Sequence, residues 1–431
     1  MRELPPEIWL RVFAFATHIP GALSHDDGQS FIAFARDKYG ISAHRRHRQA
    51  TDLMTTAVRV CKAWSSLTTQ FLFQYLLVKS GDHAVEVAAA LKRYGKDPSR
   101  QNSAGQWTVR LELALEGVHR WDEAHSAALA HIFACCPNMT VFSTAFSTAD
   151  ASLFQGRRFL RAMRDVGRRS NLKRLELKGD AALLEAILSP LASSVEALWL
   201  LPSRRSASHQ VVNHTHFPLV HAFILFEGFG WGGPPPTWTM PALQTLCTDD
   251  DNLAAPTQRR LQAFFEAHGS QLQHLVAYRS AISCLNLCTN LAEWTLPCGI
   301  VVQAVLALPA GGPLTTTLRR LTLMDDMSMV YMLRLDHIAA LNEWLGSDLF
   351  PALETIRFLL PLGRYNRRQR SRPHWEQAIE LLQEHSKQRG VRLEASLGGD
   401  EHTAEIWTTF SVEHLLDPIE LCPFKPSFSA H

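Results

Sequence analysis

The sequence lacks the features of several large classes of protein. No apolar run reaches the roughly 18 residues of a transmembrane helix, so no membrane span is expected. Lys and Arg number 43 against 41 Asp and Glu, so no excess of charge favours nucleic acid or an acidic membrane. The eight cysteines are scattered, which predicts no disulfide framework and a reducing compartment, the cytoplasm or the nucleus.

Motifs of catalysis and metal binding are also missing. The chain has no glycine-rich phosphate loop before Lys-Ser/Thr, no G-x-S-x-G turn and no H-E-x-x-H. Cys284, Cys288 and Cys298 form a metal-like grouping, but they contain no paired C-x₂-C and have no nearby histidine to complete a tetrahedral set. We therefore expect buried free cysteines, no metal, no cofactor and no catalytic residue.

Apolar residues, in contrast, are plentiful, at 46% of 431 residues, which is enough for a large core or several domains. The first of them predict a helix over residues 4–16. They fall in two stripes at helical spacing: Ile8, Val12 and Phe15, and then Trp9, Phe13 and Ala16. A helix that is apolar nearly all round must be covered on two sides, so one side needs a partner. A plain core helix is the alternative.

Two stretches near the N-terminus carry a resemblance to a known family. Residues 4–15, LPPEIWLRVFAF, look like the opening of an F-box, and residues 60–67, VCKAWSSL, resemble its later helix. The resemblance covers roughly residues 1–70 and implies a module that docks onto the adaptor of SCF-type cullin–RING ubiquitin ligases. The positions that it implies at the adaptor are Leu4, Pro5, Pro6, Ile8, Trp9, Val12, Phe13, Val60, Cys61 and Trp64.

The segment between the two F-box-like stretches, about residues 20–50, is longer than the connection in a compact F-box. We expect an inserted loop, in which the basic run 43–48 is solvated; a nuclear address or a phosphate contact is the alternative for that run. Apolar residues in the insertion could still form a turn or two of a middle helix: Phe31, Ile32, Phe34 and Ala35. Apolar residues from Leu53 to Phe71 then recur at spacings of three and four, which predicts one long amphipathic helix.

Beyond this helix, residues 73–78 and 107–115 are predicted strands, and residues 83–94 a helix. From about residue 120 an apolar template, Leu-x-x-Leu-x-Leu, recurs with first positions at 139, 172, 195, 219, 243, 272, 291, 318 and 353. The mean step, (353 − 139)/8 or about 27 residues, lies in the range of leucine-rich repeats.

We therefore expect an α/β protein with three parts. A small N-terminal helical F-box (1–75) precedes an irregular leucine-rich-repeat-like solenoid (76–400) with parallel strands on its concave side, and residues 401–431 form a cap or irregular tail. The steps vary from 19 to 35 residues and no asparagine ladder is present, so a non-repeating α/β domain is the alternative.

Alternate residues of each predicted strand should point to the concave side. On this register the candidate substrate-binding residues are Trp199, Leu201, Phe223, Leu225, His274, Val276 and Tyr278. Clustered apolar and aromatic residues on such a face indicate a binding site. If the tail or the insertion covers that side, the same residues belong to the core instead.

The resemblance thus implies a non-catalytic substrate receptor that binds a ligase adaptor and an unknown protein substrate. The alternative is a leucine-rich-repeat-like interaction scaffold with no ligase role, in which the N-terminal helices only cap the repeats.

Overall fold

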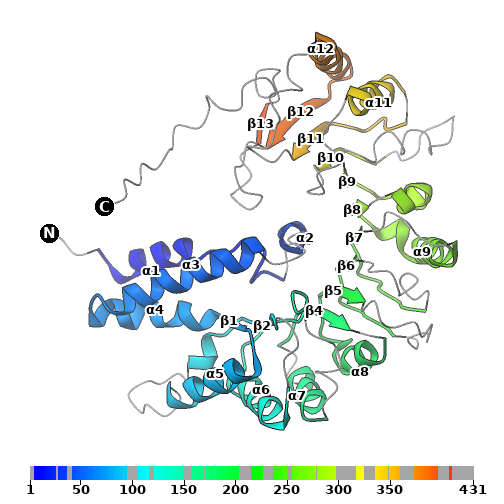
Figure 1. The fold of residues 1–431 in the computed structure, drawn as a ribbon. Coiled ribbons are helices and arrows are strands. Elements are labelled where there is room, and N and C mark those ends of the chain that lie inside the picture. Colours follow the sequence, from blue (N-terminus) through cyan, green and yellow to red (C-terminus); the bar gives the residue numbers. More distant parts are fainter. Residues whose placement is uncertain are drawn as a thin grey trace. The chain divides into compact units, whose positions relative to one another are not determined.

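Figure 1 shows the chain as a computed structural model, in which helices alternate with strands. The residues that the structure describes are 4–25, 28–35, 41–94, 104–115, 121–148, 157–168, 171–179, 181–202, 215–226, 237–249, 255–277, 279–297, 317–324, 335–347, 349–359, 373–396 and 407–409. By its internal contacts the chain divides into two compact units. Unit 1 comprises Met1–Asp249 and Leu253–His268, and unit 2 comprises Asp250–Asn252 and Gly269–His431.

Unit 1 begins with four helices: α1 (Pro6–Ala16), α2 (Gly28–Ala35), α3 (Ile41–Val58) and α4 (Lys62–Gln74). Proline at the start of α1 is favourable because the first N–H groups of a helix have no partner in the helix. Helices α1 and α3 both pack on α4. Their shared core contains Phe13, Met54 and Ala57, with Trp9, Trp64, Leu67, Phe71 and Leu72 packed around it.

The single long helix predicted across residues 53–71 is wrong, because the chain turns between Val58 and Lys62. Cys61 is the N-cap of α4: its backbone is extended (φ −159°, ψ 167°), and its Sγ accepts a hydrogen bond from the Trp64 backbone N–H at 3.5 Å. Helices on both sides of the turn bury their apolar stripes against each other, so the helical spacing continues through the break. Cysteine is not among the residues that usually signal a cap.

The segment predicted as an inserted loop also contains helices. It holds α2 and the first half of α3, and the basic run 43–48 is helical rather than a solvated loop. Within that run Arg45 and Arg48 are exposed, whereas His44 and His47 are partly buried against the sheet. The four apolar residues of α2 that predicted a middle helix, Phe31, Ile32, Phe34 and Ala35, are all buried.

Seven strands of unit 1 follow in chain order: β1 (Tyr75–Val78), β2 (Arg110–Leu113), β3 (Val141–Ser143), β4 (Arg174–Gly179), β5 (Ala197–Pro202), β6 (Ala222–Phe226) and β7 (Thr245–Asp249). Each strand pairs in parallel with the next. The helices between or after them are α5 (Gly81–Tyr94), α6 (Glu123–Cys135), α7 (Arg157–Arg168), α8 (Ala181–Leu191) and α9 (Ala255–His268). The predicted helix at 83–94 is therefore confirmed as α5.

Unit 2 continues with parallel strands: β8 (His274–Ala277), β9 (Glu293–Pro297), β10 (Arg320–Met324), β11 (Thr355–Leu359) and β12 (Arg392–Ser396). Strand β13 (Trp407–Thr409) pairs with β12 in the antiparallel direction. The α-helices among the described residues of this unit are α11 (Leu335–Gly346) and α12 (Pro373–Gln388). The α/β class is confirmed, and parallel strands in chain order are compatible with a solenoid-like arrangement. No helix among the described residues is long and apolar enough to span a membrane.

Every copy of the predicted apolar template leads into a strand. Eight strands begin two residues after the template's first position, but the copy at Leu219 is shifted by one residue. There Val220 is buried and Leu219 is exposed, and the pairing of Leu198 with Phe223 fixes the corrected register. Two adjacent apolar residues fitted the template equally well, so the pattern alone did not distinguish them.

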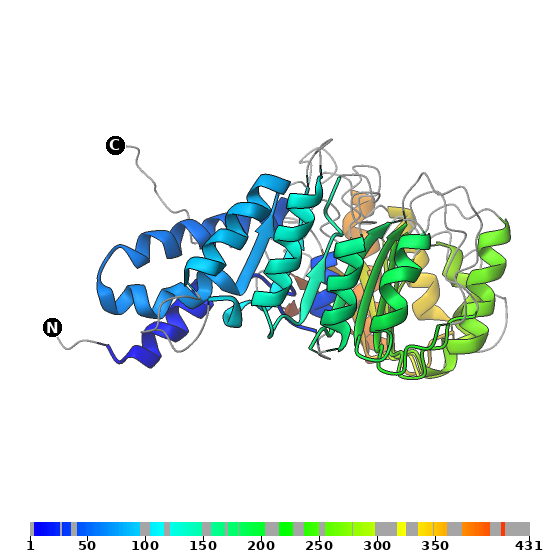
Figure 2. The ribbon, with the colours of Figure 1, turned by 90° about the horizontal axis from the view of Figure 1, so that it is seen from below.

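The strands of each unit have two faces, and successive side chains along a strand point to opposite faces. We call the outer face of unit 1 the side of Phe142, whose ring lies 5.3 Å from that of Phe133 on α6. Figure 2 looks onto the helices that lie along this side of the sheet. The inner face, the one expected to be concave, is the side of Arg110, Arg174 and Trp199. The corresponding inner residues of unit 2 include Glu293, Arg320, Thr355 and Arg392, which pair across β9 to β12.

Candidate docking surface and inner faces

Helix α1 is held on α4 by aromatic side chains. The Trp9 and Trp64 ring centroids are 4.6 Å apart, and the Phe13 ring stands edge-on to Trp64 at 5.3 Å. Phe13 also contacts Phe71 one to two turns further along α4, at 6.4 Å. Such edge-to-face pairs add to the area that the rings bury, so this side of α1 is an internal interface of unit 1.

The other side of α1 is apolar and exposed. Ile8, Val12 and Phe15 recur there at helical spacing, and Phe15 is 87% exposed; Leu4, just before the helix, is exposed too. Two further apolar residues are exposed on the neighbouring segments, Leu53 on α3 and Val60 in the turn before α4. We call this set of six residues the candidate docking surface. Several large apolar side chains exposed along one short helix are unusual for a soluble surface and typical of an interaction site.

The residues that the F-box resemblance implies at an adaptor divide into two groups. Seven of them are exposed: Leu4, Pro5, Pro6, Ile8, Val12, Val60 and Cys61. Trp9 and Trp64 are half-buried and Phe13 is buried, because these three rings join the helices to one another. The predicted set omitted Phe15 and Leu53. Phe15 had a signal in the sequence, since it continues the Ile8–Val12 stripe.

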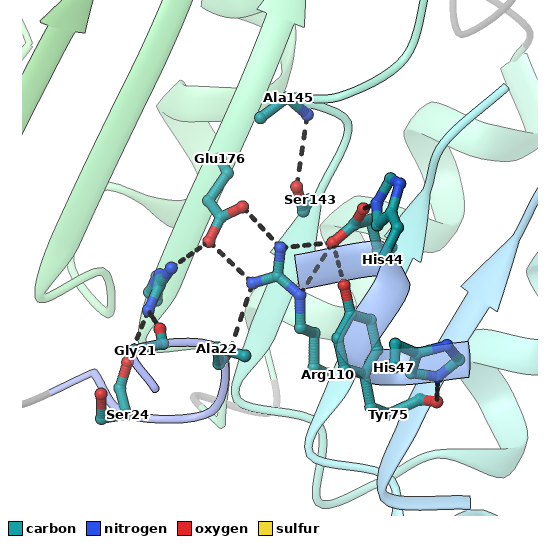
Figure 3. Close-up of polar contacts among 12 residues, drawn as sticks. Gly21, Ala22, Ser24, His44, His47, Tyr75, Arg110, Ser143, Ala145 and Glu176 are labelled. Atoms are coloured by element: carbon teal, nitrogen blue, oxygen red, sulfur yellow. Dashed lines mark hydrogen bonds and ion pairs between the residues drawn. The ribbon is translucent and has the colours of Figure 1, made fainter. Parts of the chain in front are cut away.

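The inner face of unit 1 carries a buried network of two arginines and two glutamates (Figure 3). Arg110 donates from Nη1 and Nη2 to Glu176 at 2.8 Å each, and from Nε to Glu112 at 3.0 Å. Arg174 Nη2 lies 2.6 Å from the Glu176 carboxylate. All four side chains are fully buried, and their formal charges cancel.

The network also binds backbone carbonyls of the segment between α1 and α2. Arg110 donates to the Ala22 carbonyl at 3.2 Å, and Arg174 donates to the carbonyls of Gly21 and of Ser24, the latter at 2.8 Å. Gly21 has a φ of +68°, a conformation that glycine adopts at little cost. Rings of α2 stack on the guanidinium groups, with Phe31 3.9 Å from Arg174. Figure 3 shows Gly21, Ala22 and Ser24 beside the network, with Ala22 next to Arg110.

Burial alone would raise the pKa of Glu112. The charge of Arg110, His44 Nε2 at 2.5 Å and a hydrogen bond from the Tyr75 hydroxyl at 2.6 Å outweigh that effect and lower its pKa to about 2. Burial and the neighbouring Glu112 raise the pKa of Tyr75 well above its ordinary value. The two arginines and two glutamates are paired and fully buried, so the network is suited to holding segments of the chain together.

The predicted substrate residues of unit 1 require a correction. Trp199 is fully buried on the inner face, where its ring contacts Phe31 of α2 at 6.5 Å and Phe146 at 5.4 Å. Leu201 is half-buried. Phe223 and Leu225 lie on the outer face because of the shifted register, and the Phe223 ring lies 6.0 Å from that of Phe264 on α9. The insertion therefore covers the inner face at Trp199, which is the alternative that the sequence left open.

In unit 2 the predicted residues are fewer. His274 is half-buried, with Nδ1 3.3 Å from Glu293, and Val276 is buried. Tyr278 lies outside the described residues, as does Cys298 of the cysteine grouping. Cys284 and Cys288 are buried and not disulfide-bonded, and within the described ranges no cluster of three or more His, Cys, Asp or Glu is placed to hold a metal ion.

No family model matches the chain, and no curated protein matches it significantly.

Proposed function

We propose that this chain is the substrate-recognition subunit of an SCF-type cullin–RING ubiquitin ligase. On this proposal residues 1–75 form an F-box-like module that binds the ligase adaptor. The leucine-rich-repeat-like strands and helices of residues 76–400 bind a protein substrate. The observation that carries the proposal is that α1 packs on α4 with one side and exposes Ile8, Val12 and Phe15 on the other, with exposed Leu4 just before the helix. That stripe lies within the stretch that resembles an F-box.

The exposed stripe gives a partner a large source of binding free energy. Complete burial of one Val, Leu, Ile or Phe side chain contributes roughly 1.5–3 kcal/mol relative to leaving it in water. Association also costs translational and rotational freedom, so several such residues must be buried together. Leu4 and the three exposed residues of α1, together with exposed Leu53 on α3 and Val60 in the turn before α4, meet that requirement better than a single exposed side chain such as Leu381 on α12.

A receptor of this kind needs no catalytic residue of its own. It would raise the local concentration of its substrate beside the conjugating enzyme that the ligase carries, and proximity would supply the acceleration. This role agrees with an inner-face network whose acids and bases are all paired in the interior.

The test is binding of the full chain to purified ligase adaptor, compared with Val12→Glu. Val12 is 45% exposed, so the substitution should not unfold the protein, whereas a charge buried in an interface weakens binding by more than about tenfold. Val85→Glu on α5 is the matched control, since Val85 is 43% exposed and lies outside the docking surface. Trp9→Ala is a poorer test, because Trp9 also packs on Trp64.

Adaptor binding that Val12→Glu loses and Val85→Glu keeps would support the proposal. No binding by the well-folded wild type would contradict it and favour the interaction scaffold, in which α1 to α4 only cover the first strands. Equal loss in both variants would also count against the docking surface.

A further inference from the structure

One short sequence recurs on the inner faces of both units. Strand β2 begins Arg110-Leu-Glu-Leu113, β4 begins with the same four residues from Arg174, and β12 begins Arg392-Leu-Glu394. Strand β10 carries the variant Arg320-Leu-Thr322. Because side chains alternate along a strand, each copy directs its arginine and the residue two positions later to the inner face, and its leucine to the outer face.

In unit 1 two copies act together on one segment of chain. The strand pairing aligns Arg110 with Val141 and Val141 with Arg174, so the two arginines lie in one row with a single strand between them. From that row they donate to the carbonyls of residues 21, 22 and 24. Aromatic rings of the same segment cover the guanidinium groups: Phe31 at 3.9 Å from Arg174, and Phe34 at 4.6 Å from Arg110.

Unit 2 repeats this row. The pairing aligns Arg320 with Thr355 and Thr355 with Arg392, so these two arginines also lie in one row with a single strand between them. Acidic partners are present here too: Arg320 Nη1 donates to Glu293 at 3.0 Å, and Arg392 Nη1 lies 3.9 Å from Glu394. The spacing of the donors therefore matches that of unit 1.

The two rows differ in the donors that remain available. The side chains of Arg110 and Arg174 are fully buried, whereas those of Arg320 and Arg392 are 37% and 71% exposed. Arg320 Nε is buried and has no hydrogen-bond partner among the described residues. Among the described residues, the Arg392 side chain makes a long hydrogen bond to Thr355 Oγ1, at 3.3 Å, and the distant contact with Glu394.

We propose that the inner face of β10 to β12 binds an extended polypeptide segment of the substrate. Arg320 and Arg392 would donate to its backbone carbonyls, and aromatic side chains of the segment would stack on the two guanidinium groups. The proposal follows from the comparison within the chain: the same row in unit 1 binds a segment through its backbone carbonyls and two phenylalanine rings. The assignment of the bound segment to a ubiquitination substrate rests on the function proposed above. The inference that this face binds a peptide does not depend on that function.

The test is selection from a displayed library of unstructured peptides on the full chain. The library would include residues 19–35 of this protein, the segment that fills the unit 1 face. Selected peptides would then be titrated by fluorescence anisotropy against the wild type and three variants. We expect peptides that contain aromatic residues, with binding weakened at least about tenfold by Arg320→Met combined with Arg392→Met. Arg320→Lys with Arg392→Lys should recover only part of the binding, because lysine lacks the planar fork.

Arg319→Met is the matched control. Arg319 neighbours Arg320 in sequence, and its side chain is 70% exposed, with Glu354 3.9 Å away as its ion-pair partner. Binding should survive this substitution. A library that yields no binder, or peptides that bind the Arg320→Met, Arg392→Met variant as well as the wild type, would overturn the inference.

A photoreactive residue in the selected peptide locates the face that the peptide occupies, because Thr355, between the two arginines, is only 3% exposed and unsuited to such a substitution. Cross-linking to β10, β11 or β12 supports the inference, and cross-linking to another part of the chain overturns it. Adaptor binding is measured in parallel with the same variants. If the wild type binds the adaptor but no peptide, only this inference is overturned. If it binds a peptide but not the adaptor, only the proposed ligase role is overturned.

Discussion

The inner faces of the two units contrast sharply, although the same Arg-Leu-Glu pattern supplies both. In unit 1, α2, α3 and the segment around Gly21 cover the face, and Arg110, Glu112, Arg174 and Glu176 are fully buried. In unit 2, the equivalent Arg392 is mostly exposed. The comparison teaches that alternation along a strand determines which face a side chain takes, whereas its environment depends on what else in the chain packs there.

The difference in cover changes what each ion pair contributes. A buried ion pair interacts in a low dielectric, and removing one partner leaves a charge that neither water nor protein solvates. An exposed pair is screened by water and contributes little. The inner face of unit 1 should therefore be indispensable for folding, whereas that of unit 2 should tolerate change and remain available for binding.

Replacing an arginine in each unit tests this difference most strongly. Arg110→Met leaves Glu112 without its main partner, strips one partner from Glu176 and leaves the Ala22 carbonyl without its donor. We expect it to lower the free energy of unfolding by about 3–5 kcal/mol. Arg392→Met, at the same position of the pattern in unit 2, should cost no more than about 1 kcal/mol.

Hydrogen exchange monitored by mass spectrometry is the suitable measurement, because it reports on the strands of each unit separately. Arg110→Met should increase exchange across β2 to β4, and Arg392→Met should leave β10 to β12 nearly unchanged. Similar losses from the two substitutions would show that burial of the pattern does not distinguish the units.

Acid should weaken unit 1 through the same network. The pKa of Glu112 is lowered from 4.5 to about 2, so its stabilising effect is complete above pH 4.5 and is lost as the pH falls towards 2. The shift corresponds to about 3 kcal/mol. The pKa of Glu176 is also lowered, because Arg110 and Arg174 outweigh the effect of burial, and it acts in the same direction.

Glu112→Gln isolates this contribution. The variant should be much less stable than the wild type at neutral pH, and the difference in unfolding free energy should narrow between pH 4.5 and 2. Denaturant titrations at a series of pH values measure that difference. If the difference in unfolding free energy between the wild type and Glu112→Gln stays constant over this range, Glu112 does not titrate with a lowered pKa.

Much of the fold could be predicted from the sequence. The apolar template located the strands β3 to β11, because a strand that packs on helices needs large apolar residues at fixed alternation. It failed by one residue at Leu219, where Val220 is the buried neighbour. Periodicity also missed the turn at Cys61, since paired helices keep their stripes in phase across a break.

The candidate site was harder to predict because it depends on contacts between distant segments. The exposed side of α1 was foreseen, since a surplus of apolar residues on one short helix is a local property. The covering of Trp199 by Phe31 was left open, because polarity suggested a loop where α2 and α3 lie. Nothing local to Arg110 or Arg174 shows that residues 21–24 will supply their acceptors.

A smaller effect should come from two glycines with left-handed backbones, one in each unit. Gly21 has a φ of +68° and Gly390, after α12, has a φ of +69°. Alanine at either position should cost about 1 kcal/mol in backbone strain. At Gly390 the added methyl group would meet no atom within 4 Å, so that cost should stay local.

Gly21→Ala should act differently because the Gly21 carbonyl accepts a hydrogen bond from Arg174. Strain at this turn should weaken the hydrogen bonds that hold the segment on the inner face. The backbone amides of residues 19–25 should therefore exchange faster, while those of β10 to β12 remain unaffected. Gly390→Ala, with the same intrinsic strain, should leave amides 19–25 as they are in the wild type. If the two substitutions loosen unit 1 equally or not at all, residues 21–24 are not what secures its inner face, and the two units differ for another reason.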